Sequence, residues 1–167
     1  AKGEYIAFLD SDDLWEKNKL ITQLSLLSRY PDSRFCLSDG LQFGESAVDT
    51  PKYQELFIGN IFYETLMYHK FSVRMTSLIF HREILDKVGY LSERWTEGGD
   101  VDFFYRLAYN YICIFSNERL VKVRRHKKST SQLLGDVTYI EFMEMLDEFH
   151  SSKWINKNQW NKLMSGI

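Results

Sequence analysis

Three carboxylates stand within four residues near the start of the chain, at Asp10, Asp12 and Asp13. They follow the apolar run 5–9, which has the pattern of a buried parallel strand that ends at the carboxyl edge of a sheet. Because carboxylates this close together repel one another, a divalent cation such as Mg²⁺ or Mn²⁺ is their natural partner. The alternative is that Asp13, with Glu16 three residues later, caps a following helix.

A second acidic cluster contains Asp100 and Asp102, directly after Gly98 and Gly99. Asp100 falls at the expected start of a helix, where the helix dipole and free amides stabilise an anion. A carboxylate in that place can act as the general base that removes a proton from an attacking hydroxyl. The alternative is a plain helix cap.

The only dense basic segment is 124–128, which begins with Arg124, Arg125 and His126 and is followed by Ser129 and Ser131. Cations and hydroxyls at the end of a strand suit a diphosphate leaving group, whose negative charge grows during group transfer. His126 could also ligate a cation. The alternative is a solvated basic loop, or a patch that meets membrane phosphates.

Strand and helix patterns alternate around these clusters. Gly89 is suited to cap a helix at its carboxyl end, because glycine adopts positive φ without strain. The segment 40–59 is polar and predicts a long loop. The apolar periodicity predicts strands at 5–9, 34–38, 75–80, 112–115 and 120–123, and helices at 14–30, 60–70, 82–88, about 100–111 and 137–163.

The composition predicts one globular unit. The chain has 167 residues, of which 44% are hydrophobic and 16% aromatic, so it can bury a sizeable core. Its net charge of -2 leaves no global basic field to attract nucleic acid. Cys36 and Cys113 each lie in an apolar run, which predicts buried free thiols in a reducing compartment.

The chain contains no run of about 18 apolar residues and no charged-then-apolar leader. We therefore expect a cytoplasmic protein, with peripheral contact at the inner face of the membrane as an open option. The opening at Ala1, without an initiator Met, predicts that the chain begins inside a longer protein.

Three segments together resemble family 2 glycosyltransferases. Residues 1–15 closely resemble the region around the DXD motif of that family. Residues 99–108 resemble its acidic catalytic motif, commonly Glu-Asp-Trp-Asp before an Arg-Leu-Ala helix, with Gly99 and Val101 in place of the usual Glu and Trp. Residues 123–126, with the serines that follow, look like its Arg-x-His segment.

The resemblance implies an α/β fold, namely a truncated GT-A fold with a mixed sheet flanked by helices. Residues 1–131 would be the C-terminal part of the catalytic domain, without its N-terminal nucleotide-binding strands. Residues 132–167 would form a helical tail packed on the same domain.

The resemblance also implies a role for each candidate residue. Asp100 would be the catalytic base, and Asp102 an acid that supports the site from behind it. The cofactor, Mn²⁺ or Mg²⁺, would be held by Asp12, Asp13 and His126. The sugar donor and its diphosphate would be bound by Asp10, Asp12, Arg124 and His126.

The implied reaction moves a sugar, with inversion at the anomeric carbon, from a nucleotide-diphosphate donor to a saccharide or lipid-linked acceptor. A UDP-sugar is the expected donor, and assembly of a surface polysaccharide or glycan is the expected setting. This chain by itself is expected to have little activity, and its exposed sheet edge leaves a homodimer open.

Two alternatives from other classes remain at this point. An apolar strand followed by Asp-x-Asp also resembles the haloacid dehalogenase-type phosphatases, in which Asp10 would attack phosphorus and Asp12 would act as acid. The chain could also be a non-catalytic module that binds an acceptor or a partner.

Overall fold

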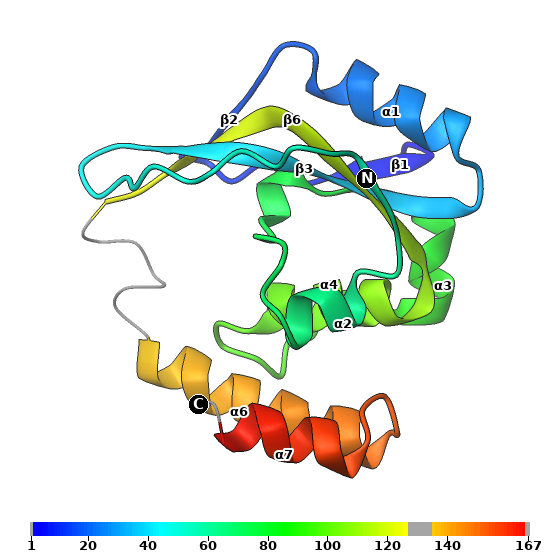
Figure 1. The fold of residues 1–167 in the computed structure, drawn as a ribbon. Coiled ribbons are helices and arrows are strands. Elements are labelled where there is room, and N and C mark those ends of the chain that lie inside the picture. Colours follow the sequence, from blue (N-terminus) through cyan, green and yellow to red (C-terminus); the bar gives the residue numbers. More distant parts are fainter. Residues whose placement is uncertain (1, 127–134, 166–167) are drawn as a thin grey trace.

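The computed structural model describes residues 2–126 and 135–165, and within them it has an α/β architecture (Figure 1). A six-stranded mixed sheet carries helices on both faces, as predicted. The strand order is β1-β5-β3-β6-β2, and β4 pairs separately with β6. The strands are β1 (Tyr5–Ala7), β2 (Leu14–Trp15), β3 (Ser33–Phe43), β4 (Phe57–Gly59), β5 (Ile79–His81) and β6 (Ile112–Arg124).

The two longest strands, β3 and β6, form the parallel centre of the sheet. Their register runs from Ser33 opposite Ile112 to Phe43 opposite Arg124, with irregularities around Asp39. The other strand pairs are antiparallel, including β2 with β6. The carboxyl end of β6 therefore lies beside the segment that connects β1 to β2.

Helices cover the two faces of the sheet unequally. On one face lies α1 (Lys19–Arg29), over a small core of Leu27, Cys36, Ile79 and Ile114. On the other face lie α2 (Phe62–Leu66), α3 (Leu85–Val88) and α4 (Gly99–Asn110), with α6 (Gly135–Ser151) and α7 (Lys157–Ser165) outside them. Two short 3₁₀ helices, η1 (Met75–Ser77) and η2 (Arg82–Ile84), flank β5.

The main core joins the sheet to α4 and α6. Phe103 and Leu107 of α4 are buried in the same cluster as Met145, Leu146 and Phe149 of α6. Burying a large apolar side chain stabilises a fold by about 1.5–3 kcal/mol, so these contacts attach α6 firmly to the rest of the molecule. The predicted boundary between residues 131 and 132 lies outside the described residues.

Two local predictions, those for the cysteines and for Gly89, are confirmed. Cys36 and Cys113 are both buried and free. Gly89 ends α3 with a φ of 74°, the positive value for which glycine was expected. In the described part of the chain, no helix is long and apolar enough to cross a membrane.

The strand predictions needed correction at three places. The first strand is an edge strand that pairs antiparallel with β5, so the prediction of a parallel strand is wrong. The predicted strands 112–115 and 120–123 are one strand, because the polar residues between them continue the pairing with β3, including Arg119 opposite Asp39. The predicted loop 40–59 contains the end of β3 and all of β4.

Further predicted boundaries also differ. The helix expected over 60–70 is shorter, because α2 covers only Phe62–Leu66. The helix expected from residue 14 begins at Lys19, because Leu14 and Trp15 pair with β6. The strand expected over 75–80 is η1 followed by β5. The helix expected over 137–163 is divided into α6 and α7 by a turn in which Lys153 has a φ of 62°.

Candidate active site

The acidic residues form a tight turn between β1 and β2. The backbone N–H of Asp13 donates to the carbonyl of Asp10 at 3.1 Å. The Asp13 side chain is 8% exposed, and its Oδ1 accepts the backbone N–H of Arg124 at 2.9 Å. Asp13 therefore ties the turn to the end of β6. It does not cap α1, whose N-cap residue is Asn18.

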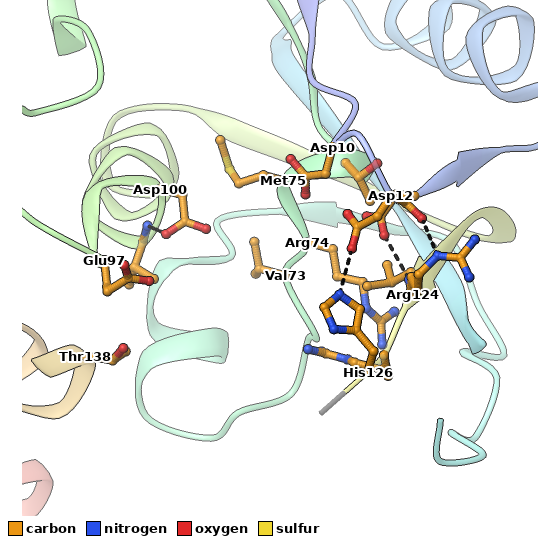
Figure 2. A pocket seen from close by; sticks show the side chains of 15 residues that line it. Asp10, Asp12, Val73, Arg74, Met75, Glu97, Asp100, Arg124, His126 and Thr138 are labelled. Carbon is orange, nitrogen blue, oxygen red and sulfur yellow. Dashed lines mark hydrogen bonds and ion pairs between the residues drawn. The ribbon is translucent and has the colours of Figure 1, made fainter. Parts of the chain in front are cut away.

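Arg124 and His126 complete this connection from the end of β6. The Arg124 Nε donates to the backbone carbonyl of Asp12 at 3.1 Å, and the guanidinium lies 4.4 Å from the ring centre of Phe43. His126 Nε2 lies 3.4 Å from Asp12 Oδ2 (Figure 2). The predicted diphosphate-binding segment is thus next to the predicted metal-binding turn, although more than 110 residues separate them in sequence.

A cavity of about 470 Å³ opens at this place, within the size range of small-molecule sites. Six predicted site residues line it together: Asp10, Asp12, Asp13, Asp100, Arg124 and His126. Asp100 lies across the cavity from Asp12 and His126 (Figure 2). Residues from all three clusters that the sequence singled out therefore line one cavity.

The cavity brings carboxylates and cations close together. Burial raises the pKa of Asp10, and the charges of Asp12 and Asp100 raise it further. Burial likewise raises the pKa of Asp13, against the hydrogen bond from Arg124 that lowers it, while Asp10 and Asp12 raise it. The acidic turn therefore carries excess negative charge that a cation would relieve.

Asp100 occupies the first turn of α4, whose N-cap residue is Gly98. Its Oδ1 accepts the N–H of Val101 at 2.7 Å. Although the side chain keeps contact with solvent, the surrounding wall of the cavity partly desolvates it, and this raises its pKa. A carboxylate of raised pKa that faces a cavity is suited to general-base catalysis.

Asp102 does not line the cavity. It is 8% exposed, and its Oδ2 accepts from Arg106 Nε at 3.0 Å and Nη2 at 2.8 Å. Arg106 also donates to the carbonyls of Val88 and Tyr90, around the end of α3. Asp102 therefore supports α4 and its contact with α3 from behind the cavity.

Glu97, which directly precedes Gly98 in the second acidic cluster, also lines the cavity, although no role was predicted for it. Sequence reasoning missed two further residues that line it, Arg74 and Thr138. Arg74 is 9% exposed, and its Nη1 donates to the carbonyl of Gly40 at 3.2 Å. Burial lowers its pKa, and the nearby charge of Arg125 lowers it further. No motif surrounds these residues in the sequence, so only their arrangement in space could identify them.

Glu141 of α6 was also missed. Its carboxylate accepts the backbone N–H groups of Thr96, Glu97 and Gly98 at 2.6, 3.0 and 2.7 Å. These groups lie at the start of α4, just before Asp100. A Cβ at Gly98 would come within 2.5 Å of Met145 Cε, so glycine permits the close approach. In the sequence Glu141 is one acidic residue of a predicted helix with no motif around it, so nothing there indicated this role.

The residues present fit a divalent cation that is shared with a ligand. In the described part of the chain, no group of three His, Cys, Asp or Glu side chains is placed to hold a metal ion without further ligands. Mg²⁺ and Mn²⁺ commonly use one or two protein ligands and complete their shell with water and substrate phosphates. Asp12 and His126, in contact beside two further carboxylates, offer that kind of donor set.

Residues 127–131 of the predicted basic and serine-containing segment lie outside the described residues. The described part of this segment ends at His126. Arg124, Arg125 and His126 all line the cavity.

The sequence matches no protein-family model, and no curated protein matches it. The structure, in contrast, resembles crystal structures of S. aureus TarS. It matches TarS 1-349 in complex with UDP-GlcNAc with a TM-score of 0.67 at 16% identity, over 89% of this chain and 43% of that chain. It also matches a structure described simply as TarS 1-349, with a TM-score of 0.61 at 17% identity, over 89% of this chain and 41% of that chain.

A third match is TarS 1-349 in complex with UDP, with a TM-score of 0.55 at 16% identity, over 86% of this chain and 42% of that chain. The chain thus spans less than half of the structures that it matches. Because the identity is low, the likeness concerns the fold. The chain shares a GT-A-like fold with part of the glycosyltransferase TarS.

Proposed function

We propose that this chain is part of a glycosyltransferase that moves a sugar from a nucleotide-diphosphate donor to an acceptor hydroxyl. The observation that carries the proposal is the single cavity into which Asp100, the acidic turn and the end of β6 converge. The shared fold adds support, since the TarS structures include complexes with UDP-GlcNAc and UDP. A UDP-sugar is accordingly the proposed donor.

The donor would lie with its diphosphate near Arg124 and His126 and its sugar near Asp10 and Asp12. Cations at this end of the cavity would stabilise the negative charge that develops on the leaving diphosphate. Mn²⁺ or Mg²⁺ would be held by Asp12 and His126, with Asp13 beside them, and would supply further charge stabilisation when bound. The contact between Asp12 and His126 supports this assignment.

Asp100 would remove the proton from the acceptor hydroxyl as that oxygen attacks the anomeric carbon. Asp100 lies on the opposite side of the cavity from Arg124 and His126 (Figure 2). An attack from the side of Asp100 would therefore expel the diphosphate toward Arg124, and a single displacement of this kind inverts the anomeric carbon. Asp102 would act only through α4 and Arg106.

The remaining proposals concern the setting of the reaction. The acceptor would be a saccharide or a lipid-linked saccharide, in the assembly of a surface or cell-wall polysaccharide. The enzyme would be of the family 2, hexosyltransferase type, and would work in the cytoplasm or at the inner face of the membrane. Nucleic acid is not a proposed partner, and the chain alone would have little activity.

The two alternatives are not favoured. The phosphatase alternative uses Asp10 and Asp12 and gives no role to Asp100, which faces the same cavity from the other side. A non-catalytic module would not need a carboxylate of raised pKa facing that cavity.

The first test is calorimetric binding of UDP, with GDP as control, with Mn²⁺ and after its removal by EDTA. It would use this chain and a longer natural polypeptide that contains it. We expect Mn²⁺-dependent binding of UDP by the longer polypeptide, and its loss in Asp12→Ala and Asp13→Ala. If the longer polypeptide binds no nucleoside diphosphate, the glycosyltransferase proposal is wrong.

A further inference from the structure

Arg74 is a buried cation in the wall of the large cavity. Its Nη1 donates to the carbonyl of Gly40 at 3.2 Å, and its Nε is buried without a hydrogen-bond partner among the described residues. None of the ion pairs in the described part of the chain includes Arg74. The Asp39 carboxylate, whose charge acts on Arg74, accepts instead from the N–H groups of Gly40 and Arg119. A buried cation without a counterion is unfavourable, so the position of Arg74 indicates an anionic ligand.

Arg125 adds a second cation at the same place. Burial lowers the pKa of Arg74, and the charge of Arg125 lowers it further, because the two guanidinium groups lie near each other in the wall of the cavity. Within the described residues, Arg125 forms no ion pair either. Arg124 and His126, in contrast, contact Asp12 through its carbonyl and its carboxylate. The positive charge that no acidic residue of the described chain contacts therefore lies at Arg74 and Arg125.

The two arginines line the cavity together, and Arg74 lies on the side of Arg124 and His126, away from Asp100 (Figure 2). The remaining nitrogen of its guanidinium, Nη2, forms no hydrogen bond among the described residues and keeps accessible surface. Gly40 permits this arrangement, since a Cβ there would come within 3.2 Å of Arg74 Nη1. A guanidinium presents N–H groups that match the oxygens of a phosphoryl group. An anion in the cavity can therefore reach Arg74 directly.

We propose that Arg74 is a further donor-binding residue, which together with Arg125 holds a phosphoryl group of the donor diphosphate. The proposal rests on the proposed glycosyltransferase function, because that function supplies the anion. Arg124 and His126 remain for the other phosphoryl group and for the cation shared with Asp12. Since Arg74 is buried and Arg124 is exposed, water screens the charge of Arg74 less, and Arg74 stabilises the leaving diphosphate more strongly.

The first test is calorimetric titration of this chain with inorganic pyrophosphate in the presence of EDTA, which excludes an effect of bound metal ions. We expect the parent chain to bind pyrophosphate and Arg74→Met to raise the dissociation constant about 10- to 100-fold, the usual effect of a hydrogen bond to a charged group. Arg74→Lys keeps the charge without the planar N–H groups, so it should recover only part of the affinity. Pyrophosphate should also raise the melting temperature of the parent chain more than that of Arg74→Met.

Arg82→Met is the matched control, because it removes the same charge elsewhere. Arg82 Nε and Nη2 are also buried without a partner among the described residues, but Arg82 lines a different pocket and not the cavity. This variant should bind pyrophosphate like the parent chain. The proposal is overturned if the parent chain binds no pyrophosphate, if Arg74→Met binds it like the parent, or if both variants weaken binding equally.

A second test uses the longer polypeptide with UDP and with uridine. Arg74→Met should weaken UDP binding about 10- to 100-fold and leave uridine binding unchanged, whereas a merely structural role would weaken both alike and overturn the proposal. Because pyrophosphate binding needs neither a nucleoside nor turnover, a chain that binds it through Arg74 but transfers no sugar would refute only the proposed function. Conversely, a polypeptide that transfers sugar while Arg74→Met keeps full UDP affinity would refute only the role of Arg74.

Discussion

At the scale of single residues, the acidic side chains that look alike in sequence have different roles. Asp13 is buried and binds the backbone of Arg124, whereas Asp12 contacts His126 at the cavity. Asp100 faces the cavity from the other side, while Asp102 is occupied by Arg106. The different surroundings, rather than the residue type, separate structural acids from those available for chemistry.

Asp100→Asn is predicted to lower the rate of sugar transfer about 10²–10⁴-fold, the usual contribution of a general base. UDP affinity should be unchanged, because the change lies across the cavity from Arg124 and His126. Steady-state transfer kinetics and calorimetry on the longer polypeptide measure the two effects. Asp86→Asn, at an exposed acid in the first turn of α3, is the control that should keep full activity.

The pH profile of transfer gives a second prediction for the same residue. The base acts as the carboxylate, and desolvation raises the pKa of Asp100 above 3.8. As the pH falls, kcat/KM should therefore decline at a higher pH than it would for an ordinary aspartate. A rate that stays constant down to pH 4 would contradict the assignment of Asp100 as base.

Lys19 provides a prediction on stability. It is fully buried, donates to Gln23 Oε1 at 2.8 Å and lies 4.2 Å from the ring centre of Trp15. Burial lowers its pKa from 10.5 to about 8. Between these two values the unfolded chain binds more protons than the folded one, so the free energy of unfolding should rise with pH, by up to about 3 kcal/mol.

Lys19→Met should remove this rise, whereas Lys17→Met, at an exposed position of the same segment, should keep it. Urea unfolding at pH 7 and pH 10.5 measures the difference for each variant. If the parent chain and Lys19→Met show the same pH dependence, the lysine is not buried as the structure has it.

At the scale of elements, the candidate site depends on contacts between segments that are distant in sequence. The turn after β1 is tied to the end of β6, and the start of α4 is tied to α6. The first turn of a helix has N–H groups without partners inside the helix. Glu141 accepts from the N–H groups around the start of α4 and so fixes the position of Asp100.

Glu141→Gln is predicted to lower kcat without changing UDP affinity, and to destabilise the fold by about 1–3 kcal/mol. Burial raises the pKa of Glu141, but its three backbone hydrogen bonds lower it more. Its stabilising effect is therefore present above the pKa of the unfolded chain and is lost as the pH falls through the lower folded value. The difference in kcat between the parent chain and Glu141→Gln should therefore become smaller at acid pH, where Glu141 of the parent is itself protonated.

Glu144→Gln is the matched control on the same helix, because Glu144 forms only an exposed pair with Arg94 at 3.1 Å. Such pairs contribute about 0–1 kcal/mol. Equal effects of the two variants on kcat would show that Glu141 does not position Asp100.

At the scale of the whole molecule, the helical layers are uneven. On one face of the sheet, α6 and α7 form a second layer outside α2, α3 and α4. On the other face, α1 is the outermost described element. Ile21 of α1 is 72% exposed, with Leu20 and Leu24 beside it on the helix. Exposed apolar groups of this kind favour association with another surface.

We predict that this chain self-associates through the apolar side chains of α1 in a concentration-dependent way, a contact different from the sheet-edge homodimer that the sequence left open. Ile21→Lys should weaken the association while leaving the melting temperature nearly unchanged, because the side chain packs on little else. Sedimentation velocity over a range of concentrations measures the first effect and thermal unfolding the second. A chain that stays monomeric at all concentrations would refute the prediction.

The sequence alone determined the local features of this protein. The acidic turn, the start of a helix at Asp100, the cap at Gly89 and the buried thiols follow from residue type and short-range periodicity, which depend on near neighbours. The resemblance of three short segments added the expectation that they form one site. Their convergence on one cavity agrees with it.

Only the tertiary structure decided which distant segments meet. The continuity of β6 depends on its register with β3. The hydrogen bonds that Glu141 accepts from the backbone N–H groups of Thr96 and Gly98 depend on how α6 packs on the core. A small pocket between α2 and α4 likewise exists because these two helices lie side by side. Such contacts join residues some 35 to 80 positions apart. They are set by the packing of whole elements, for which no local sequence pattern carries a signal.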